Sequence, residues 1–274
     1  MATSKDICYS VDVYPYDTRD SDLEGYFSVS TVHFLCHGEA EHNVNKEYRN
    51  VENIDARLTD KGKEQCRAIA KRIAKCRVGT VHHDIYTRCD LLCVSPLTRC
   101  ITSLIRSTKP VLAARPNTPV IAHEYIRDAV DFHCDRRRPV SQLALEFPIV
   151  QFDLVPNHDT LWDEYEAKLG SAEKFTQHRE SAQIYKVADR ARNFFKWLGT
   201  RTEKHVLVCS HSDFLRILTN YGYTDDFKPE QRMDDRQVKE DVPVLNFKGG
   251  ESFAQTVRAD FDHCEIRSVR IAFP

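Results

Sequence analysis

The sequence lacks a long hydrophobic run. No stretch approaches the ~18 consecutive apolar residues from which a membrane-spanning helix is recognised. The opening segment, MATSKDICYS, has neither an apolar core nor a small-residue cleavage site, so no secretory signal is predicted. These features predict a cytoplasmic protein that makes no contact with a membrane.

Net charge is also nearly absent. The 39 lysines and arginines almost balance the 41 aspartates and glutamates, which leaves a formal charge of -2 at pH 7. A chain with this balance has no overall electrostatic attraction to nucleic acid or to an acidic membrane surface. We therefore expect neither partner, while a local basic pocket is compatible with the same total.

The chain has no paired-cysteine motif, although it contains ten cysteines. No C-x-x-C occurs, so the spacing does not indicate a zinc site. Inside a cell the thiols are expected to stay reduced. Most of them, for example Cys66, Cys93 and Cys209, lie in apolar patterns, where cysteine behaves as a small hydrophobic residue.

Internal repeats, low-complexity tracts and Gly/Ser linkers are missing as well. Their absence favours one continuous domain with insertions. We expect residues 1–30 to form an N-terminal arm packed on the core, and residues 31–274 to form one domain with an inserted region around 124–185.

Short apolar runs alternate with helical patterns along the chain. Runs predicted as buried strands are Thr31–Cys36, Asp90–Val94, Pro119–His123 and His205–Ser210. Helical periodicity follows Thr59, a suitable N-cap, and recurs at Leu97–Ser107, between Val187 and Leu198, and at Phe214–Asn220. This alternation predicts an α/β fold with three layers, in which helices cover both faces of a mostly parallel sheet.

Polar residues stand where three predicted strands end. His37 follows the first strand, His211 follows the last, and Arg99 lies early in the helix after Asp90–Val94. Ligands of open α/β sheets bind beyond the carboxyl ends of the strands. A phosphate there would gain a helix N-terminus and a bidentate guanidinium, and a neutral imidazole can attack phosphorus. The pattern therefore predicts a phosphate site in which the imidazoles of His37 and His211 flank one phosphoryl group.

Four motifs resemble the signatures of the histidine phosphatase superfamily, whose fold is phosphoglycerate mutase-like, and they occur in the family's order. They are FLCHGEAEHN at 34–43, LTDKGKEQ at 58–65, SPLTR at 95–99 and VCSHS at 208–212. Further stretches, among them CDRRR at 134–138 and CEIRS at 264–268, resemble a eukaryotic branch of phosphoglycerate mutase-like proteins found in plants, fungi and protists. The resemblance covers residues 31–268.

The resemblance implies a role for each matching residue. It implies that His37 is the nucleophile, that Arg99 clamps the phosphate and that His211 stabilises the transferring group. It places Asn43 at the pocket edge and identifies Glu124 as the proton donor that an alkoxide leaving group needs. Because these groups are not a carboxylate cluster, we expect no metal and no other cofactor.

Cys36 departs from the family pattern, which has an arginine before the nucleophile. A preorganised charged donor contributes about 2.7–4 kcal/mol to catalysis, or about a hundred- to a thousandfold in rate. The resemblance thus implies hydrolysis of a phosphorylated small molecule through a phosphohistidine at His37, weakened by Cys36. The alternatives are a catalytically impaired pseudophosphatase that acts as a binding protein, and a phosphoglycerate-type mutase.

Overall fold

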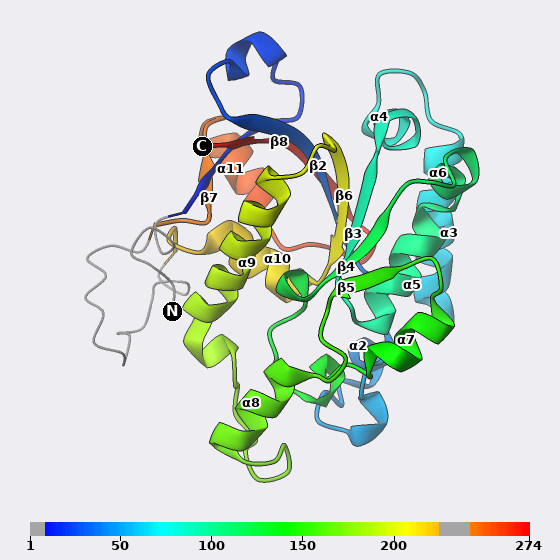
Figure 1. Cartoon of the computed structure of the whole chain (residues 1–274), viewed down its shortest axis with the longest axis vertical. Coiled ribbons are helices and arrows are strands. Elements are labelled where there is room, and N and C mark those ends of the chain that lie inside the picture. Colours follow the sequence, from blue (N-terminus) through cyan, green and yellow to red (C-terminus); the bar gives the residue numbers. More distant parts are fainter. Residues whose placement is uncertain (1–8, 225–241) are drawn as a thin grey trace.

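A single twisted sheet organises the chain (Figure 1). The computed structural model describes residues 9–224 and 242–274, and the spatial order of the eight strands is β5-β4-β3-β6-β2-β8-β1-β7. The strands are β1 (Val11–Pro15), β2 (Ser28–Cys36), β3 (Leu91–Val94), β4 (Val120–His123), β5 (Gln151–Leu154), β6 (His205–Ser210), β7 (Leu245–Phe247) and β8 (Ile266–Phe273).

The sheet is mostly parallel, as predicted. Only β8 runs antiparallel to its neighbours, β2 and β1. The central strands β2 and β6 are parallel, and their register pairs Cys36 with Ser210. His37 and His211 therefore leave the sheet side by side at its carboxyl edge, and the His37 N–H donates to the Ser210 carbonyl at 3.1 Å.

Helices cover both faces of the sheet (Figure 1). The α-helices are α2 (Glu41–Asn45), α3 (Asp60–Ala74), α4 (Val81–Arg88), α5 (Thr98–Ser107), α6 (Lys109–Ala114), α7 (Val140–Glu146), α8 (Thr160–Leu169), α9 (Ile184–Gly199), α10 (Ser212–Asn220) and α11 (Glu251–Arg258). Helices α9, α10 and α11 share one apolar core with the sheet, and α3 to α7 share the other. The predicted three-layer arrangement is confirmed.

Side chains of each central strand point alternately to the two faces of the sheet, and so they contribute to both apolar cores. On β2, Phe34 and Cys36 face the α9 side, whereas Leu35 faces the α3 side. Successive side chains of a strand point to opposite faces, so a strand buried on both faces is a continuous apolar run. None of the helices in the described residues has the length and apolar character of a membrane span.

The start of α3 fixes the loop that follows β2. Thr59 caps this helix, because its Oγ1 accepts a hydrogen bond from the Gly62 N–H at 3.0 Å. A Cβ atom at Gly62 would lie 2.0 Å from the Glu39 carbonyl oxygen, so no larger residue fits there. The glycine lets α3 pack directly against the chain just beyond His37.

The N-terminal segment differs from the expected arm. Within residues 1–30, Val11–Pro15 form β1, which pairs antiparallel with β8 and parallel with β7. Val11 and Val13 are buried in the core while Asp12 between them is not, which is the two-residue period of a strand. This segment is therefore an integral part of the sheet; residues 1–8 lie outside the described residues.

The region between β4 and α9 contains short elements. It holds the 3-10 helices η3 (Glu124–Ile126) and η4 (His133–Asp135), then α7, β5 and α8. In Figure 1, α8 lies below the sheet on the same side as α2, which follows His37. The segment predicted around 124–185 therefore contributes residues to the edge of the sheet where the histidines lie.

Candidate active site

His37 is buried directly beyond β2 and has a defined tautomer. Its Nδ1 lies 2.7 Å from the Gly38 carbonyl oxygen. A carbonyl only accepts, so Nδ1 carries the hydrogen and Nε2 keeps its lone pair. Burial, together with the Arg99 charge, lowers the pKa of His37 to about 3. His37 is therefore neutral at ordinary pH, as a nucleophile must be.

The loop after His37 is held from two sides. The Gly38 N–H donates to Ser103 Oγ of α5 at 2.9 Å. A Cβ atom at Gly38 would lie 2.7 Å from the Gly62 carbonyl oxygen of α3, so glycine is required at this close approach. The carbonyl that orients the His37 ring is thus fixed by α3 and α5.

His211 lies beside His37, with ring centroids 5.1 Å apart. Its Nδ1 accepts from Arg99 Nε at 3.2 Å, so Nε2 carries the hydrogen and donates to Ser95 Oγ at 2.7 Å. Burial and the Arg99 charge lower the pKa of His211 well below its ordinary value. Two neutral imidazoles therefore meet at the carboxyl edge of the sheet.

Arg99 is fully buried in the first turn of α5. Its Nη1 donates to the Cys134 carbonyl at 2.6 Å, and its Nη2 donates to Asp128 at 3.1 Å and to Asp135 at 3.3 Å. One guanidinium thus faces two carboxyl groups as well as His211. The predicted phosphate clamp adjoins the histidines, and protein groups already surround it.

Glu124 does not reach this site. Its carboxylate accepts hydrogen bonds from Arg127 Nη1 at 2.6 Å and from Arg137 Nε at 3.2 Å. Both of these arginine side chains are fully buried, and they hold Glu124 in an ion-pair network with Asp159. Glu124 is not among the residues that line the cavity at His37. Its expected position in the pocket is therefore corrected.

Asp128 occupies the place expected for Glu124. Its Oδ2 accepts from Arg99 and lies 3.4 Å from His211 Nδ1, and its side chain is 14% exposed. Burial and the neighbouring Asp135 raise the pKa of Asp128 well above its ordinary value. A carboxyl group with a raised pKa thus lies beside the histidines. The sequence analysis missed it, although Asp128 belongs to the same Glu124–Asp128 stretch.

A cavity of about 350 Å³ opens over these groups. Its lining includes His37, His42, Asn43, Tyr48 and Asp128. Asn43 is therefore at the pocket as predicted, where its Oδ1 accepts a hydrogen bond from the Ala40 N–H at 3.0 Å. Arg99 and His211 contact each other beside His37 but, like Glu124, they are not among the residues that line the cavity.

His42 adds a buried donor to the cavity wall. The Asn43 side-chain amide lies 3.2 Å from His42 Nε2, and since Asn43 Oδ1 is already an acceptor, its NH₂ group donates to Nε2. Nδ1 of His42 then carries the hydrogen. That atom is buried and has no hydrogen-bond partner among the described residues. A bound oxygen atom would satisfy it.

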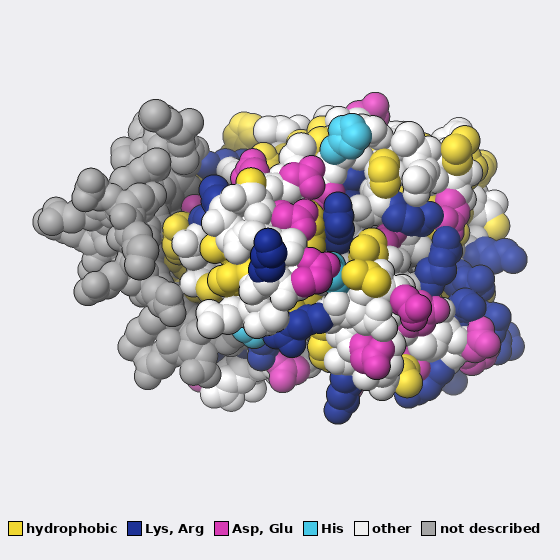
Figure 2. Space-filling model, turned by 90° about the horizontal axis from the view of Figure 1, so that it is seen from below, with side chains coloured by type: hydrophobic (Ala, Val, Ile, Leu, Met, Phe, Trp, Pro, Cys, Tyr) yellow, Lys and Arg dark blue, Asp and Glu magenta, His cyan; other side chains and the backbone are white. Residues whose placement is uncertain are grey.

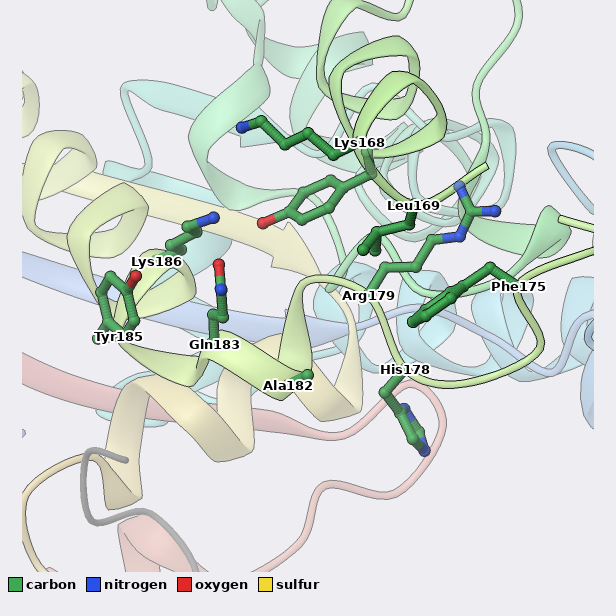
Figure 3. A pocket seen from close by; sticks show the side chains of 10 residues that line it. Lys168, Leu169, Phe175, His178, Arg179, Ala182, Gln183, Tyr185 and Lys186 are labelled. Carbon is green, nitrogen blue, oxygen red and sulfur yellow. The ribbon is translucent and has the colours of Figure 1, made fainter. Parts of the chain in front are cut away.

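A second cavity, of about 410 Å³, adjoins the first at His178, which lines both. Figure 3 shows Lys168, Arg179 and Lys186 among the side chains around it. Arg179 is buried, stacks on the Trp162 ring at 4.7 Å and leaves Nε and Nη1 without partners among the described residues. Figure 2 shows the mixed acidic and basic surface of the underside of the molecule.

Cys36 ends β2 as a buried thiol. Its N–H donates to the Glu265 carbonyl at 3.1 Å, and burial raises the pKa of its thiol well above the ordinary value. The side chain is therefore a neutral S–H group, which is only a weak donor. Within residues 9–224 and 242–274, no three His, Cys, Asp or Glu side chains are arranged to hold a metal ion.

Comparison with known proteins finds similarity to one family and to several plant proteins. The sequence profile of the histidine phosphatase superfamily (branch 1) matches residues 32–129. A phosphoglycerate mutase-like protein of Arabidopsis thaliana is 27% identical over 233 residues, which cover 73% of this chain and 78% of the relative. Phosphoglycerate mutase-like protein 1 of the same plant is 26% identical, covering 68% of this chain and 69% of the relative.

Among solved structures, mycobacterial hydrolase 1 is similar with a TM-score of 0.48 and 13% identity, over 90% of this chain and 96% of that one. The profile match includes β2 with His37 and the α5 turn with Arg99, and it ends just beyond Asp128. Residues 32–129 thus match the profile of the histidine phosphatase superfamily, and 73% and 68% of the chain align with two phosphoglycerate mutase-like proteins of Arabidopsis thaliana.

Proposed function

We propose that this protein hydrolyses phosphomonoesters through a phosphohistidine on His37. The observation that carries the proposal is the hydrogen bond from His37 Nδ1 to the Gly38 carbonyl, which leaves Nε2 unprotonated at the cavity. A neutral imidazole with an oriented lone pair is what attack on phosphorus requires. Arg99 and His211, directly beside it, provide the electrostatic surroundings for the transferring group.

The first chemical step transfers the phosphoryl group to the protein. His37 Nε2 attacks phosphorus while the bond from phosphorus to the ester oxygen breaks. Asp128 gives its proton to the departing alkoxide, because burial keeps this carboxyl group protonated. The products of the step are the free alcohol, a phosphorylated His37 and an ionised Asp128.

The second step releases the phosphate. The Asp128 carboxylate takes a proton from a water molecule whose oxygen attacks phosphorus, and the bond from phosphorus to Nε2 breaks. Inorganic phosphate leaves, His37 is neutral again, and Asp128 has regained its proton. Asp128 thus acts as the acid in the first step and as the base in the second, so the site returns to its starting state.

The substrate we propose is a phosphorylated small molecule with a second anionic group. The cavity at His37 holds the phosphoryl group, and the adjoining cavity offers Lys168, Arg179 and Lys186. Arg179 is buried, and although Glu166, Asp131 and Glu173 act on its charge, its Nε and Nη1 have no hydrogen-bond partner among the described residues, which an anion would supply. A carboxylate or a second phosphate on the substrate would supply that anion.

Trapping the intermediate tests the proposed function. In a single turnover with a labelled aryl phosphate, we expect acid-labile label on His37 and none in the His37→Gln variant. His263→Gln is the matched control, because its ring centroid lies 5.8 Å from that of His37 and the residue has no assigned role. Label on another residue, or label that survives in His37→Gln, would contradict the proposal.

A binding protein is the second candidate function. The enclosure of Arg99 by Asp128, Asp135 and a backbone carbonyl favours it, because these groups compete with phosphate for the guanidinium. Cys36 favours it too, since it supplies no charge. Binding of a phosphate analogue in the absence of any phosphohistidine, with substrate in excess, would support this candidate over the hydrolase.

His42→Phe is expected to raise KM for a phosphomonoester about tenfold and to change kcat by less than about threefold. The variant keeps a ring in place but removes the unpartnered Nδ1–H donor, and a hydrogen bond to a charged phosphate oxygen contributes about 1.5 kcal/mol or more, which corresponds to about tenfold. Steady-state kinetics measure the change. His82→Phe, on α4, is the control. A normal KM in His42→Phe would show that this donor does not meet the substrate.

A further inference from the structure

Two buried cysteines meet behind the His37 loop. Cys66 on α3 and Cys264 just before β8 are 198 residues apart in sequence, and their Sγ atoms lie 3.6 Å apart. Both residues are at most 5% exposed. A disulfide bond is about 2.05 Å long, so an approach of about 1.5 Å would join them. Their sulfur atoms are therefore in contact as free thiols.

The environment favours reaction at Cys66. The two sulfur atoms are within hydrogen-bond distance, and mainly because of this contact the pKa of Cys66 is lowered to about 7. The thiolate is the reactive form of cysteine. Cys264 lies close enough to act as the resolving thiol. The backbone at Cys264 is left-handed, with φ of 61°, a conformation that costs energy for a residue other than glycine.

Both cysteines also contact the backbone that orients the nucleophile. The Cys264 N–H donates to the carbonyls of Cys36 at 3.1 Å and His37 at 3.2 Å. Cys66 Sγ lies against Gly38, since a Cβ atom there would be 3.2 Å from it. The Gly38 carbonyl in turn accepts from His37 Nδ1. Movement of either sulfur is thereby transmitted to the imidazole.

We propose that Cys66 and Cys264 form a redox modification site, at which a peroxide converts the two thiols into a disulfide that displaces His37. The disulfide itself is independent of the function proposed above. Its effect on turnover rests on that function, because the ring that moves is the nucleophile.

The reaction balances in two steps. The Cys66 thiolate attacks one peroxide oxygen, the O–O bond breaks, and a sulfenic acid and hydroxide form. The Cys264 sulfur then attacks the Cys66 sulfur, the S–O bond breaks, and a second hydroxide leaves. Protons from the two thiols turn both hydroxides into water. The thiols lose two electrons to the peroxide, and an exogenous dithiol reverses the change by thiol–disulfide exchange.

The expected consequence is a loss of activity of about a hundredfold. Attack on phosphorus needs a reacting distance near 3 Å, and a misplacement of about 1 Å costs on the order of a hundredfold in rate. The movement of about 1.5 Å that brings the two sulfur atoms to bonding distance is comparable to that misplacement. Reduction should restore the original rate, because neither residue takes part in the proposed transfer.

Peptide mass spectrometry of the full-length protein tests the site. After hydrogen peroxide treatment and alkylation, we expect a linked peptide containing Cys66 and Cys264. Cys66→Ser and Cys264→Gly should each abolish it, and glycine also suits the left-handed backbone at position 264. Cys76→Ser is the matched control, because Cys76 lies just beyond the end of α3 and is partly exposed. It should leave the linked peptide unchanged.

The outcomes separate the two proposals. A linked peptide with a reversible fall in turnover, present in Cys76→Ser and absent in Cys264→Gly, supports the whole inference. Linkage of Cys66 or Cys264 to a different cysteine, or irreversible oxidation without any link, overturns the site. A linked peptide with unchanged turnover overturns its effect on His37. If the protein never forms a phosphohistidine, the proposed hydrolase fails, and the mass spectrum still decides whether the disulfide forms.

Discussion

Asp128→Asn is expected to lower kcat for an alkyl phosphate by about a hundred- to ten-thousandfold, which is the usual contribution of a general acid. The carboxyl group of Asp128 lies 3.4 Å from His211 Nδ1 and lines the cavity at His37. Asparagine keeps the shape and can still accept the Arg99 hydrogen bond, but it has no proton to give. Single-turnover kinetics should show the loss in the step that releases the alcohol.

Glu124→Gln is the control that distinguishes the two carboxyl groups. Because Arg127 and Arg137 hold Glu124 away from the cavity, we expect kcat within about threefold of the natural protein. Thermal unfolding should accompany this comparison, because the substitution weakens an ion-pair network around buried arginines. A folded Glu124→Gln variant that loses as much activity as Asp128→Asn would return the role of proton donor to Glu124.

Comparing two leaving groups in the same Asp128→Asn protein tests its role as proton donor without interference from any change in protein stability. A nitrophenolate leaves without protonation, whereas an alkoxide needs a proton. Asp128→Asn should therefore lower the rate with an alkyl phosphate much more than the rate of His37 phosphorylation from an aryl phosphate. Equal losses for both substrates would show that Asp128 does not act on the leaving group.

The pH profile follows from the two shifted pKa values. Transfer requires a protonated Asp128, whose pKa is raised by burial, so activity should be present below that pKa and should be lost as the pH rises through it. Transfer also requires a neutral His37. The pKa of this residue is lowered to about 3, so its protonation should lower the rate only as the pH falls toward that value. In Asp128→Asn the alkaline fall in the transfer rate should disappear.

Cys36→Arg is expected to raise phosphomonoester hydrolysis about ten- to a thousandfold, which is the range covered by one preorganised charged donor. The buried guanidinium of Arg99, beside the histidines, faces both Asp128 and Asp135. A second cation next to His37 would offset one of these carboxyl groups and attract the phosphate. The gain should appear as a higher rate of His37 phosphorylation.

Two variants distinguish charge from packing at position 36. Cys36→Met adds length without charge and should not raise the rate. Both substitutions overpack the core and should cost about 1–3 kcal/mol of stability, so they differ in charge. His37→Ala combined with Cys36→Arg should return the rate to background, which assigns the gain to the nucleophile. A folded Cys36→Arg protein with no gain, together with rapid hydrolysis by the natural protein, would mean that another cation already completes the clamp.

The central strands and the two histidines were predictable because their signals are local. β2 and β6 are continuous apolar runs, as strands buried on both faces are, and each ends at a histidine. Their parallel pairing brings His37 and His211 together without further information. The helix after Thr59 was predictable for the same reason, since its cap and its apolar stripe lie within one segment.

The presence of Asp128 rather than Glu124 at the cavity was not predictable, because the positions of both carboxyl groups depend on distant partners. Glu124 accepts a hydrogen bond from Arg137, a residue that follows η4 in the chain. Asp128 accepts a hydrogen bond from Arg99 on α5. Nothing in the local sequence tells these two carboxyl groups apart. Likewise, β8 pairs with β1 and β2, which lie near the other end of the chain. The short, amphipathic β1 has only a weak strand pattern in its own sequence.

The position of β8 also has a consequence for how the site is assembled. This strand lies between β2 and β1, and the segment just before it forms hydrogen bonds with Cys36 and His37. Until residues 266–273 are in place, β2 is an unpaired edge next to an apolar core, and such edges promote aggregation. The pairing of β2 with β8 spans most of the chain, and contacts of such long range form slowly. A chain that stops before β8 would therefore expose this edge and lack the hydrogen bonds that Cys264 and Glu265 form with Cys36 and His37.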